Sequence, residues 1–467
     1  MSHELHEEWM QNFTFDELSV GQGATIVRSL TDADIAGFAA VSGDLNPTHL
    51  DDDYARGEGL SGKTAHGMWS GAMISTMLGT VFPGPGTLYI EQRMRFLAAA
   101  RAGDRLEISV HVKTLDPSTR EVTLDCLVRR QDGPQLMVGE AVVKAPAKKQ
   151  RVPRANGLRW HVFDAAAGVE RLLQSATSLE RLRCAIVHPC DVESLRGALE
   201  AARHGLFTPV IVAPKDRLLA VADEGELDLG GIEIVDVPHS HAAAQRAAEL
   251  AALDQVQALM KGSLHTDELM KAVLSRPELR TKRRLSHVFR FDVPMYHKPL
   301  LVTDAALNIE PTLDEKVDIV QNAIDLARIL GCAMPKVAVL AAVETVNPRM
   351  VCTIDAAALC KMAERGQITG GVIDGPLAFD NAISIEAARI KKINSPVAGD
   401  PDILMVPDLV SGNILAKQLE YLGGAMGSGI VLGARVPIAL TSRADGATAR
   451  LASAALAVLV AHSNRKR

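Results

Sequence analysis

Apolar and polar residues alternate along three stretches in the first third of the chain. These stretches, separated by short turn sequences, are 105–113, 122–129 and 136–144. The period of two predicts strands with one buried face, and the short turns predict antiparallel pairing. Ahead of them, Thr31 can cap a helix in which Ile35, Phe38 and Val41 recur at helical spacing. We therefore expect an α+β domain, an antiparallel sheet with a central helix at 31–42.

After about residue 158 the pattern changes to short, wholly apolar runs that alternate with alanine-rich helical segments. The apolar runs are 184–187, 209–213, 337–340 and 403–406, and two of the helical segments are 242–253 and 315–330. Strands without polar positions are typical of parallel sheets covered by helices on both faces. The segment 146–157 is basic, contains Pro and Gly and has no periodicity. We expect a domain at 1–147, a linker at 148–158 and a second domain at 159–467.

Composition narrows the class of protein. With 467 residues the chain is long enough for two or three domains. A net charge of -6 argues against nucleic-acid binding, which needs clustered excess Lys and Arg. The six cysteines form no C-x-x-C pair, a pattern typical of reduced intracellular thiols. The N-terminus lacks the pattern of a signal peptide, and the longest apolar run, 452–461, is shorter than the ~20 residues that cross a bilayer. We expect a soluble, cytoplasmic protein without membrane or nucleic-acid partners.

The stretch Ser42–His49 contains the residues that hydration of a polarised double bond requires. Asp44 and His49 lie five positions apart across a turn that Pro47 stiffens, so both side chains can face one cavity. Hydration of an enoyl thioester needs a group that takes a proton from water, a group that protonates the α-carbon, and a donor for the enolate oxygen. The N–H of Gly67 is a candidate for that donor. These residues predict an enoyl-CoA hydratase site.

The same motifs resemble the MaoC-type (R)-specific enoyl-CoA hydratases over nearly all of residues 12–145. The segments that carry the resemblance are 42–49, 64–68, 83–86, 95–97 and 103–104. It implies a hot-dog fold, a sheet wrapped around the helix at 31–42, and a dimer with active sites near its interface. It also implies that Asp44 and His49 hold one water for syn addition, with Gly67 as the oxyanion donor; which of the two is the primary base stays open. We assign Asn46 and His66, from the same motifs, to substrate binding.

Two segments of the second domain have the composition of anion-binding loops. Lys261, Gly262 and Ser263 end an apolar run, and Thr266 is a potential cap for the next helix, an arrangement suited to phosphate. The glycine-rich stretch 423–429 is predicted as a loop whose N–H groups could cradle a phosphate, although a tight turn is the commoner role of such a stretch.

A third candidate in this domain follows a predicted strand. Ser442 and Arg443 come directly after the apolar run 436–441 and should lie at a carboxyl end, where open α/β sheets bind ligands. His239 and His241 have no third ligand at a usual metal spacing, so we interpret them as structural and predict no metal.

A series of motifs in this half resembles the phosphate acetyl/butyryltransferases, from about residue 160 to the C-terminus. The motifs are 260–262, 285–287, 303–305, 335–338, 374–381, 395–399, 411–417 and 441–445. The resemblance implies two α/β subdomains flanking a cleft, as in the isocitrate and isopropylmalate dehydrogenases, and dimerisation. The implied reaction is acyl-CoA plus phosphate to acyl phosphate plus CoA, with no cofactor and no covalent acyl-enzyme.

Residue roles in this half follow from the resemblance. Arg443 is the candidate cation for the tetrahedral oxyanion and the departing thiolate, and Ser442 for a hydrogen bond near the thiol or phosphate. We assign Asn413 and Asp445 to substrate binding. Acetyltransferase relatives usually place an aspartate base seven positions after the serine, where this chain has Ala449. Asp445 is then the alternative base.

The leading hypothesis is a bifunctional acyl-CoA enzyme, hydratase and phosphotransacylase, that forms a homo-oligomer built from dimers. A second hypothesis makes the C-terminal half a non-catalytic acyl-CoA sensor that regulates the hydratase. A third, a metal- and NAD-dependent decarboxylating dehydrogenase, is disfavoured because the clustered aspartates for a metal are missing. Acyl-chain length stays open.

Overall fold

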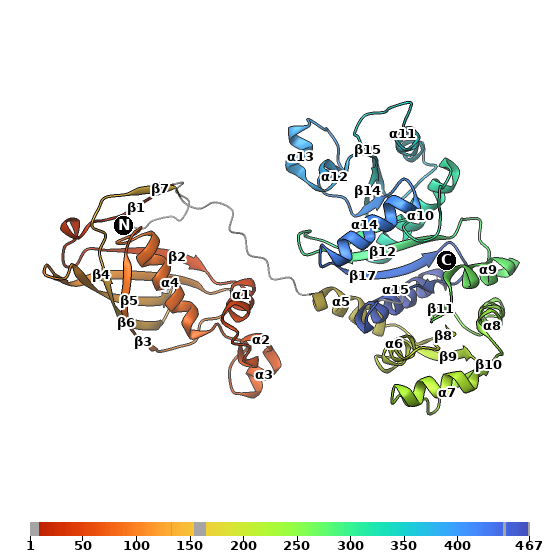
Figure 1. The fold of residues 1–467 in the computed structure, drawn as a ribbon, viewed down its shortest axis with the longest axis horizontal. Helices are drawn as coiled ribbons and strands as arrows, with labels where there is room; N and C mark the ends of the chain where they lie inside the picture. The colour runs from red at the N-terminus through yellow and green to blue at the C-terminus, as the bar shows by residue number, and fades with distance from the viewer. Residues whose placement is uncertain (1–8, 132, 154–164, 442–444, 466–467) are drawn as a thin grey trace. The chain divides into compact units, whose positions relative to one another are not determined.

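The chain divides into two compact units, 1–162 and 163–467. The structure is a computed structural model, and it describes residues 9–131, 133–153, 165–441 and 445–465 (Figure 1). Each unit has its own hydrophobic core.

The N-terminal unit is built on a five-stranded antiparallel sheet with the order β2-β4-β5-β6-β3. Its strands are β2 (Gly23–Ser29), β3 (Leu88–Phe96), β4 (Arg105–Asp116), β5 (Glu121–Arg130) and β6 (Gln135–Lys144). The three strands predicted from the period of two are confirmed as β4, β5 and β6. A separate pair joins β1 (Trp9–Gln11) to β7 (Arg151–Pro153), so part of the range expected as a linker forms a strand.

The helix against this sheet is a different one from the helix that the sequence pattern suggested. The helices are η1 (Phe15–Glu17), α1 (Asp32–Ser42), α2 (Pro47–Leu50), α3 (Asp52–Gly57) and α4 (Gly67–Thr80). The predicted helix exists as α1, but α4 packs on the sheet and buries Trp69, Ile74 and Met77 in the core (Figure 1). The prediction of a sheet wrapped around 31–42 is therefore wrong. Ile35 is buried, yet Val41 is 74% exposed, because α1 contributes only part of one face to the core.

The C-terminal unit contains an eleven-stranded mixed sheet with the order β10-β9-β8-β11-β18-β17-β12-β13-β16-β14-β15. Its strands are β8 (Leu182–Val187), β9 (Phe207–Ala213), β10 (Glu233–Asp236), β11 (Ala258–Lys261), β12 (Ser286–Asp292), β13 (Leu300–Thr303), β14 (Lys336–Leu340), β15 (Val372–Leu377), β16 (Ile403–Met405), β17 (Met426–Leu432) and β18 (Ile438–Ala439). The sheet is mainly parallel, as expected; the antiparallel pairs involve β12 and β17.

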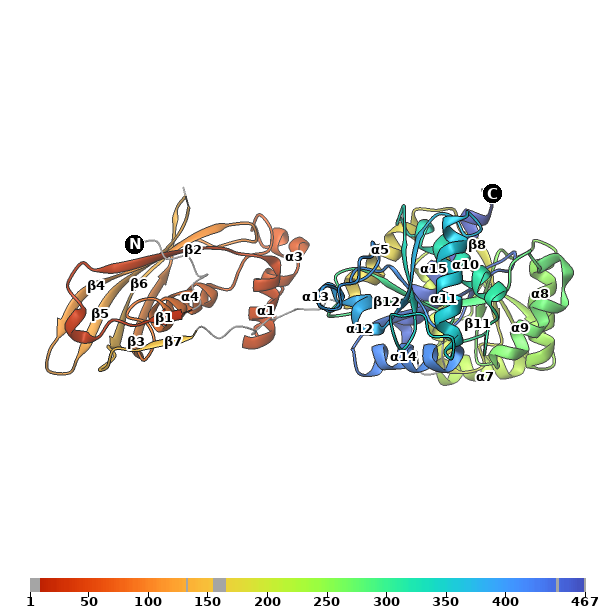
Figure 2. The same ribbon diagram turned by 90° about the horizontal axis from the view of Figure 1, so that it is seen from above.

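Helices cover both faces of this sheet (Figure 2), as the wholly apolar strands predicted. They are α5 (Ala165–Thr177), α6 (Val192–Arg203), α7 (Lys215–Glu224), α8 (Ser240–Ala252), α9 (Thr266–Ser275), η2 (Pro277–Leu279), α10 (Leu313–Ile329), α11 (Val351–Glu364), α12 (Phe379–Ile383), α13 (Ile385–Ile390), α14 (Leu409–Tyr421) and α15 (Ala447–Arg465). From β8 the chain adds β9 and β10 on one side, and β11 then returns to pair in parallel on the other side of β8. At such a point the connections leave toward opposite faces, which opens a crevice at the carboxyl ends of the strands.

The structure corrects two predicted details of this unit. In the stretch 423–429, expected as a phosphate loop or a tight turn, a turn at Gly423 leads into β17, and residues 426–429 pair with β12. Its glycines allow close packing: a Cβ on Gly427 would lie 2.8 Å from the Phe291 ring. Thr266 is the first residue of α9 and His265 precedes it as the cap residue, so Thr266 does not cap the helix.

The structure also describes the state of the cysteines and the length of the helices. All six cysteines are free, and three of them are buried. No helix among the described residues is long and apolar enough to cross a membrane.

Candidate functional site

The side chains of Asp44, His49 and His66 meet in the N-terminal unit. One potential ligand atom from each lies within 4.8 Å of the others. Asp44 lies in the turn after α1, His49 in α2, and His66 directly before α4. The sequence placed Asp44 and His49 in one site as the catalytic pair and assigned His66 to substrate binding there; the structure brings the side chains of all three together.

Local hydrogen bonds shape the turn that carries Asp44. Helix α1 ends at Gly43, whose φ of 74° is left-handed and favours glycine. The Asp44 carboxylate accepts a hydrogen bond from the N–H of Asn46 over 3.3 Å. The side chain of Asn46 in turn caps α2 by accepting from the Thr48 N–H over 3.1 Å. In this structure Asn46 therefore has a capping role, whereas the sequence assigned it to substrate binding.

His49 is half-buried and held by one edge of its ring. Its Nδ1 lies 2.7 Å from the carbonyl oxygen of Thr64. Because a carbonyl can only accept, Nδ1 carries the hydrogen and the Nε2 lone pair of the neutral ring stays available. This tautomer is the one that a general base at Nε2 requires.

His66 connects the two residues, and Gly67 follows it. His66 is only 3% exposed, and its Nε2 donates to the backbone oxygen of Asp44 over 2.9 Å. Its ring stacks on that of His49, with 3.8 Å between centroids. Gly67 is the first residue of α4, so its N–H has no acceptor within the helix and lies at the positive end of the helix dipole. That N–H can receive an oxyanion.

This cluster is the one group of three or more potential metal ligands found among the described residues. The rings of His49 and His66 are 3.8 Å apart between centroids and tilted by 32° to each other. One nitrogen of each ring is hydrogen-bonded to a backbone carbonyl, which leaves the other nitrogen of each ring and the Asp44 carboxylate for a further partner.

The C-terminal unit places Lys261, Gly262 and Ser263 at the carboxyl ends of β8 and β11. The N–H groups of Gly262 and Ser263 donate to the carbonyl oxygens of Val187 and His188, each over 2.9 Å. Lys261 is 5% exposed, and its Nζ lies 3.3 Å from the carbonyl oxygen of Gly262. Gly262 packs so tightly that an added Cβ would lie 2.5 Å from the carbonyl oxygen of His188. Ser263 Oγ donates to that same oxygen over 2.9 Å and lies 3.1 Å from His188 Nδ1. Burial, with a smaller contribution from Arg217, lowers the pKa of His188.

Ser442 and Arg443 lie outside the described residues, but the residues that flank them are described. Arg450, in the first turn of α15, is 2% exposed. It donates to Thr441 Oγ1 over 3.0 Å and to the carbonyl oxygen of Asp445 over 3.2 Å. No motif in the sequence marked Arg450. The one cue was its position in the first turn of a helix, where the helix dipole disfavours positive charge.

Asn413 lies on α14, near the loop that follows β13. Its Nδ2 donates to the carbonyl oxygen of Ala305 over 3.2 Å, and the residue is exposed. In the same loop, the buried Asp304 accepts hydrogen bonds from the N–H groups of Ala306 and Leu307 and from Asn308. Burial raises the pKa of Asp304. Asp304 belongs to a motif that carried the family resemblance, but the sequence did not single it out.

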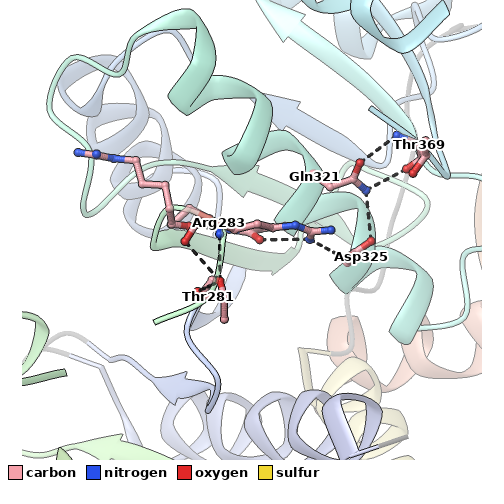
Figure 3. Close-up of polar contacts among 9 residues, drawn as sticks. Thr281, Arg283, Gln321, Asp325 and Thr369 are labelled. Carbon is pink, nitrogen blue, oxygen red and sulfur yellow. Dashed lines mark hydrogen bonds and ion pairs between the residues drawn. The ribbon is translucent and has the colours of Figure 1, made fainter. Parts of the chain in front are cut away.

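A polar network beside α10 illustrates a different use of charged residues (Figure 3). Arg283 donates to Asp325 over 2.7 Å, and Gln321 exchanges two hydrogen bonds of 2.9 Å with the backbone of Thr369. An adjacent cavity of about 420 Å³ is lined by Thr281, Arg283 and Asp325 among others. Because these groups hydrogen-bond to one another and no predicted site residue lines the cavity, we interpret the network as stabilising the fold.

Comparisons with known proteins identify a family for each of the two units. Residues 240–458 match the family model described as phosphate acetyl/butaryl transferase, and residues 20–127 match that of the MaoC like domain. A phosphate acetyltransferase of Rhizobium meliloti is 59% identical over 297 residues, which cover 63% of this chain and 94% of that protein. A phosphate butyryltransferase of Clostridium acetobutylicum is 38% identical over 62% of this chain and 97% of its own length.

Solved structures extend the comparison. The crystal structure of a branched-chain phosphotransacylase from Enterococcus faecalis is 32% identical, covers 60% of this chain and 99% of its own, and has a TM-score of 0.53. The R-hydratase PhaJ1 from Pseudomonas aeruginosa is 40% identical over 33% of this chain and 99% of its own, with a TM-score of 0.32. The chain thus belongs to the phosphate acetyl/butyryltransferase family through its C-terminal unit and carries a MaoC-like domain in its N-terminal unit.

Proposed function

We propose that the chain is a bifunctional acyl-CoA enzyme. Its N-terminal unit adds water to short-chain 2-enoyl-CoA with (R) specificity, and its C-terminal unit transfers an acyl group reversibly between CoA and phosphate. The observation that carries the first activity is the meeting of the Asp44 carboxylate with the His49 imidazole. The relative at 59% identity over nearly its full length supports the second.

In the hydration step, water adds across the double bond next to the thioester. One of Asp44 and His49 takes a proton from the water while the water oxygen bonds to the β-carbon. The negative charge that develops on the thioester oxygen is met by the Gly67 N–H at the start of α4. The proton taken from the water passes to the other side chain, which delivers it to the α-carbon on the same face, so both side chains return to their starting state.

In the transfer step, a phosphate oxygen attacks the thioester carbonyl and the CoA thiolate leaves. Arg443 stabilises the tetrahedral oxyanion and the thiolate, and Ser442 hydrogen-bonds near them. Lys261, at the carboxyl end of β11, supplies positive charge for the phosphate, and Gly262 and Ser263 position it. Asp445, four positions before Ala449, takes the role of the carboxylate that the relatives usually have at position 449.

A second candidate function follows from Ala449. Without the aspartate that acetyltransferase relatives usually have there, the C-terminal unit could bind acyl-CoA without turning it over and regulate the hydratase. The two functions differ in one product, because only a transferase releases CoA in a phosphate-dependent way.

Exposed apolar surfaces support self-association through both units. The edge strand β3 exposes Leu88 and Ile90 by 63% and 51%. Ile414 on α14 is 62% exposed, and Leu422, directly after α14, is 83% exposed. Ile414 also lines an apolar cavity of about 860 Å³. Large exposed apolar side chains on an edge strand and on one helix are typical of subunit interfaces. A dimer through each surface would link chains into a closed oligomer.

Two assays on the purified full chain test the proposal. Loss of crotonyl-CoA absorbance measures hydration; Asp44→Asn and His49→Ala should each abolish it without lowering the unfolding temperature, and full activity in both variants would refute the hydratase assignment. Phosphate-dependent CoA release from acetyl-CoA and butyryl-CoA measures transfer, with Arg443→Ala as the inactive variant. No release from any short acyl-CoA, together with acyl-CoA-dependent changes in hydration, would favour the sensor.

A further inference from the structure

We infer that His66 is a positioning residue of the hydration site, which holds the Asp44 carboxylate and the His49 imidazole at their working separation. The inference rests on the proposed hydratase function and deepens it. His66 differs from its two neighbours in burial: it is 3% exposed, whereas Asp44 is exposed and His49 half-buried. A buried side chain with contacts to both can serve as a fixed reference for them.

The first contact holds the backbone that carries Asp44. The turn after Gly43 is exposed, and the Asp44 N–H bonds locally, to Ser42 Oγ over 3.2 Å. The hydrogen bond from His66 Nε2 to the Asp44 carbonyl oxygen crosses 22 positions of sequence with a length of 2.9 Å. It therefore ties the exposed turn to the buried start of α4.

The second contact holds the plane of the His49 ring. The bond from His49 Nδ1 to Thr64 fixes one edge of that ring but leaves rotation about the bond. The His66 ring, stacked at 3.8 Å, removes that rotation. Phe38 of α1 also contacts His66, with 5.1 Å between ring centroids and 46° between the ring planes, so a second aromatic ring holds His66 in place. With edge and plane both set, the direction of the Nε2 lone pair is set.

The tautomer of His66 suits this role. Because Nε2 donates to a carbonyl, Nδ1 of the neutral ring carries no hydrogen, and it is buried without a hydrogen-bond partner among the described residues. The face turned to His49 is then neutral and can rest against that ring while it gains and loses a proton. His66 also precedes Gly67, so the same backbone segment places the oxyanion donor.

Two substitutions separate the two contacts. His66→Gln keeps an N–H donor near the Nε2 position and loses the flat ring, whereas His66→Phe keeps a ring that can stack and loses the donor. We measure kcat, KM and the pH profile of kcat/KM for crotonyl-CoA hydration on the full chain, with thermal unfolding alongside. His111→Gln, an exposed histidine on β4 of the same unit, is the matched control.

We expect each His66 variant to lose about 10- to 100-fold in kcat with little change in KM, as for misplaced catalytic groups, and His111→Gln to match the parent. His66→Phe, which frees the Asp44 turn, and His66→Gln, which frees the His49 ring, should both shift the acid limb of the pH profile. Parent-like kcat in both variants, or losses of kcat that equal the loss of folded protein with an unmoved pH profile, would overturn the inference. A parent enzyme without any hydration would instead refute the proposed function itself.

Discussion

Arg450 Nη1 donates a hydrogen bond to Thr441 Oγ1 over 3.0 Å, and its Nε donates to the carbonyl oxygen of Asp445 over 3.2 Å. One buried guanidinium thus contacts the residues on both sides of Ser442 and Arg443. Gly197 on α6 leaves the room for it, since an added Cβ there would lie 2.7 Å from Arg450 Cδ. The contacts make Arg450 an anchor for the two ends of this loop.

Arg450→Met should therefore impair transfer more than stability alone explains. Loss of both contacts lets the loop ends shift, and misplacement of about 1 Å can cost about 100-fold in rate. The measurement is phosphate-dependent CoA release, with hydration by the same sample as the internal reference. Arg465→Met, an exposed arginine on the same helix, should change neither. Equal rates in Arg450→Met and the parent would contradict the anchoring role.

Replacement of Gly67 by proline removes the backbone N–H of this position. Proline is well tolerated as the first residue of a helix but has no N–H, and His66 before it has φ -58° and ψ 135°, a conformation allowed ahead of proline. Gly67→Pro should lower kcat for hydration by about 100- to 1000-fold, the usual cost of one oxyanion donor.

Gly67→Ala is the control for that experiment. It keeps the N–H and introduces a Cβ that would lie 3.2 Å from the Phe96 ring, a contact that proline shares. The alanine variant should keep most of the parent rate. Similar losses in both variants would show that the Phe96 contact, and not the N–H, is responsible.

Because the His287 ring is buried, we expect the C-terminal unit to lose stability at acid pH. Its ring is fully buried without hydrogen-bond partners among the described residues, and burial lowers its pKa to about 3. In the unfolded chain the pKa is near its ordinary value of about 6.5. Between these values the unfolded state binds a proton that the folded state does not, so the free energy of unfolding falls by about 1.4 kcal/mol per pH unit as pH drops below about 6.5.

His287→Leu removes this linkage. Calorimetry of the full chain at pH 7.5, 6.5 and 5.5 should show a smaller drop of the C-terminal transition for the variant than for the parent. The same pH dependence in both proteins would assign the acid sensitivity to other groups.

Gly262 tests the crevice between β8 and β11. An added Cβ would lie 2.5 Å from the His188 carbonyl oxygen, a distance at which the backbone must move. Gly262→Ala should lower the unfolding temperature of this unit and lower phosphate-dependent CoA release at least about tenfold, because the backbone that carries Lys261 shifts. Gly446→Ala, where a Cβ meets nothing within 4 Å, is the matched control. Parent-like CoA release by the Gly262→Ala variant would remove this loop from the phosphate site.

The sequence was most informative where the relevant contacts are local. Asp44 and His49 lie five positions apart in one capped turn, so their types and spacing predicted their meeting. His66 acts through a bond across 22 positions and a ring stack, which no periodicity reveals. Its motif marked it only as a substrate contact.

The wrong predictions have physical reasons as well. Helices α1 and α4 are both largely apolar without a pronounced one-sided stripe, so periodicity alone does not tell which of them packs on the sheet. The glycines of 423–429 suggested a flexible loop, yet in β17 their missing side chains make room for the rings of Phe291 and His287. Glycine alone does not separate these two uses, because both follow from the absence of a Cβ.

The central claim is that one chain holds two separate sites for CoA thioesters. The most direct test measures crotonyl-CoA hydration and phosphate-dependent CoA release on the same preparations of the parent chain, Asp44→Asn and Arg443→Ala. We predict both activities in the parent, loss of hydration alone in Asp44→Asn, and loss of CoA release alone in Arg443→Ala. A parent that lacks either activity, or one substitution that abolishes both in a folded protein, would contradict the claim.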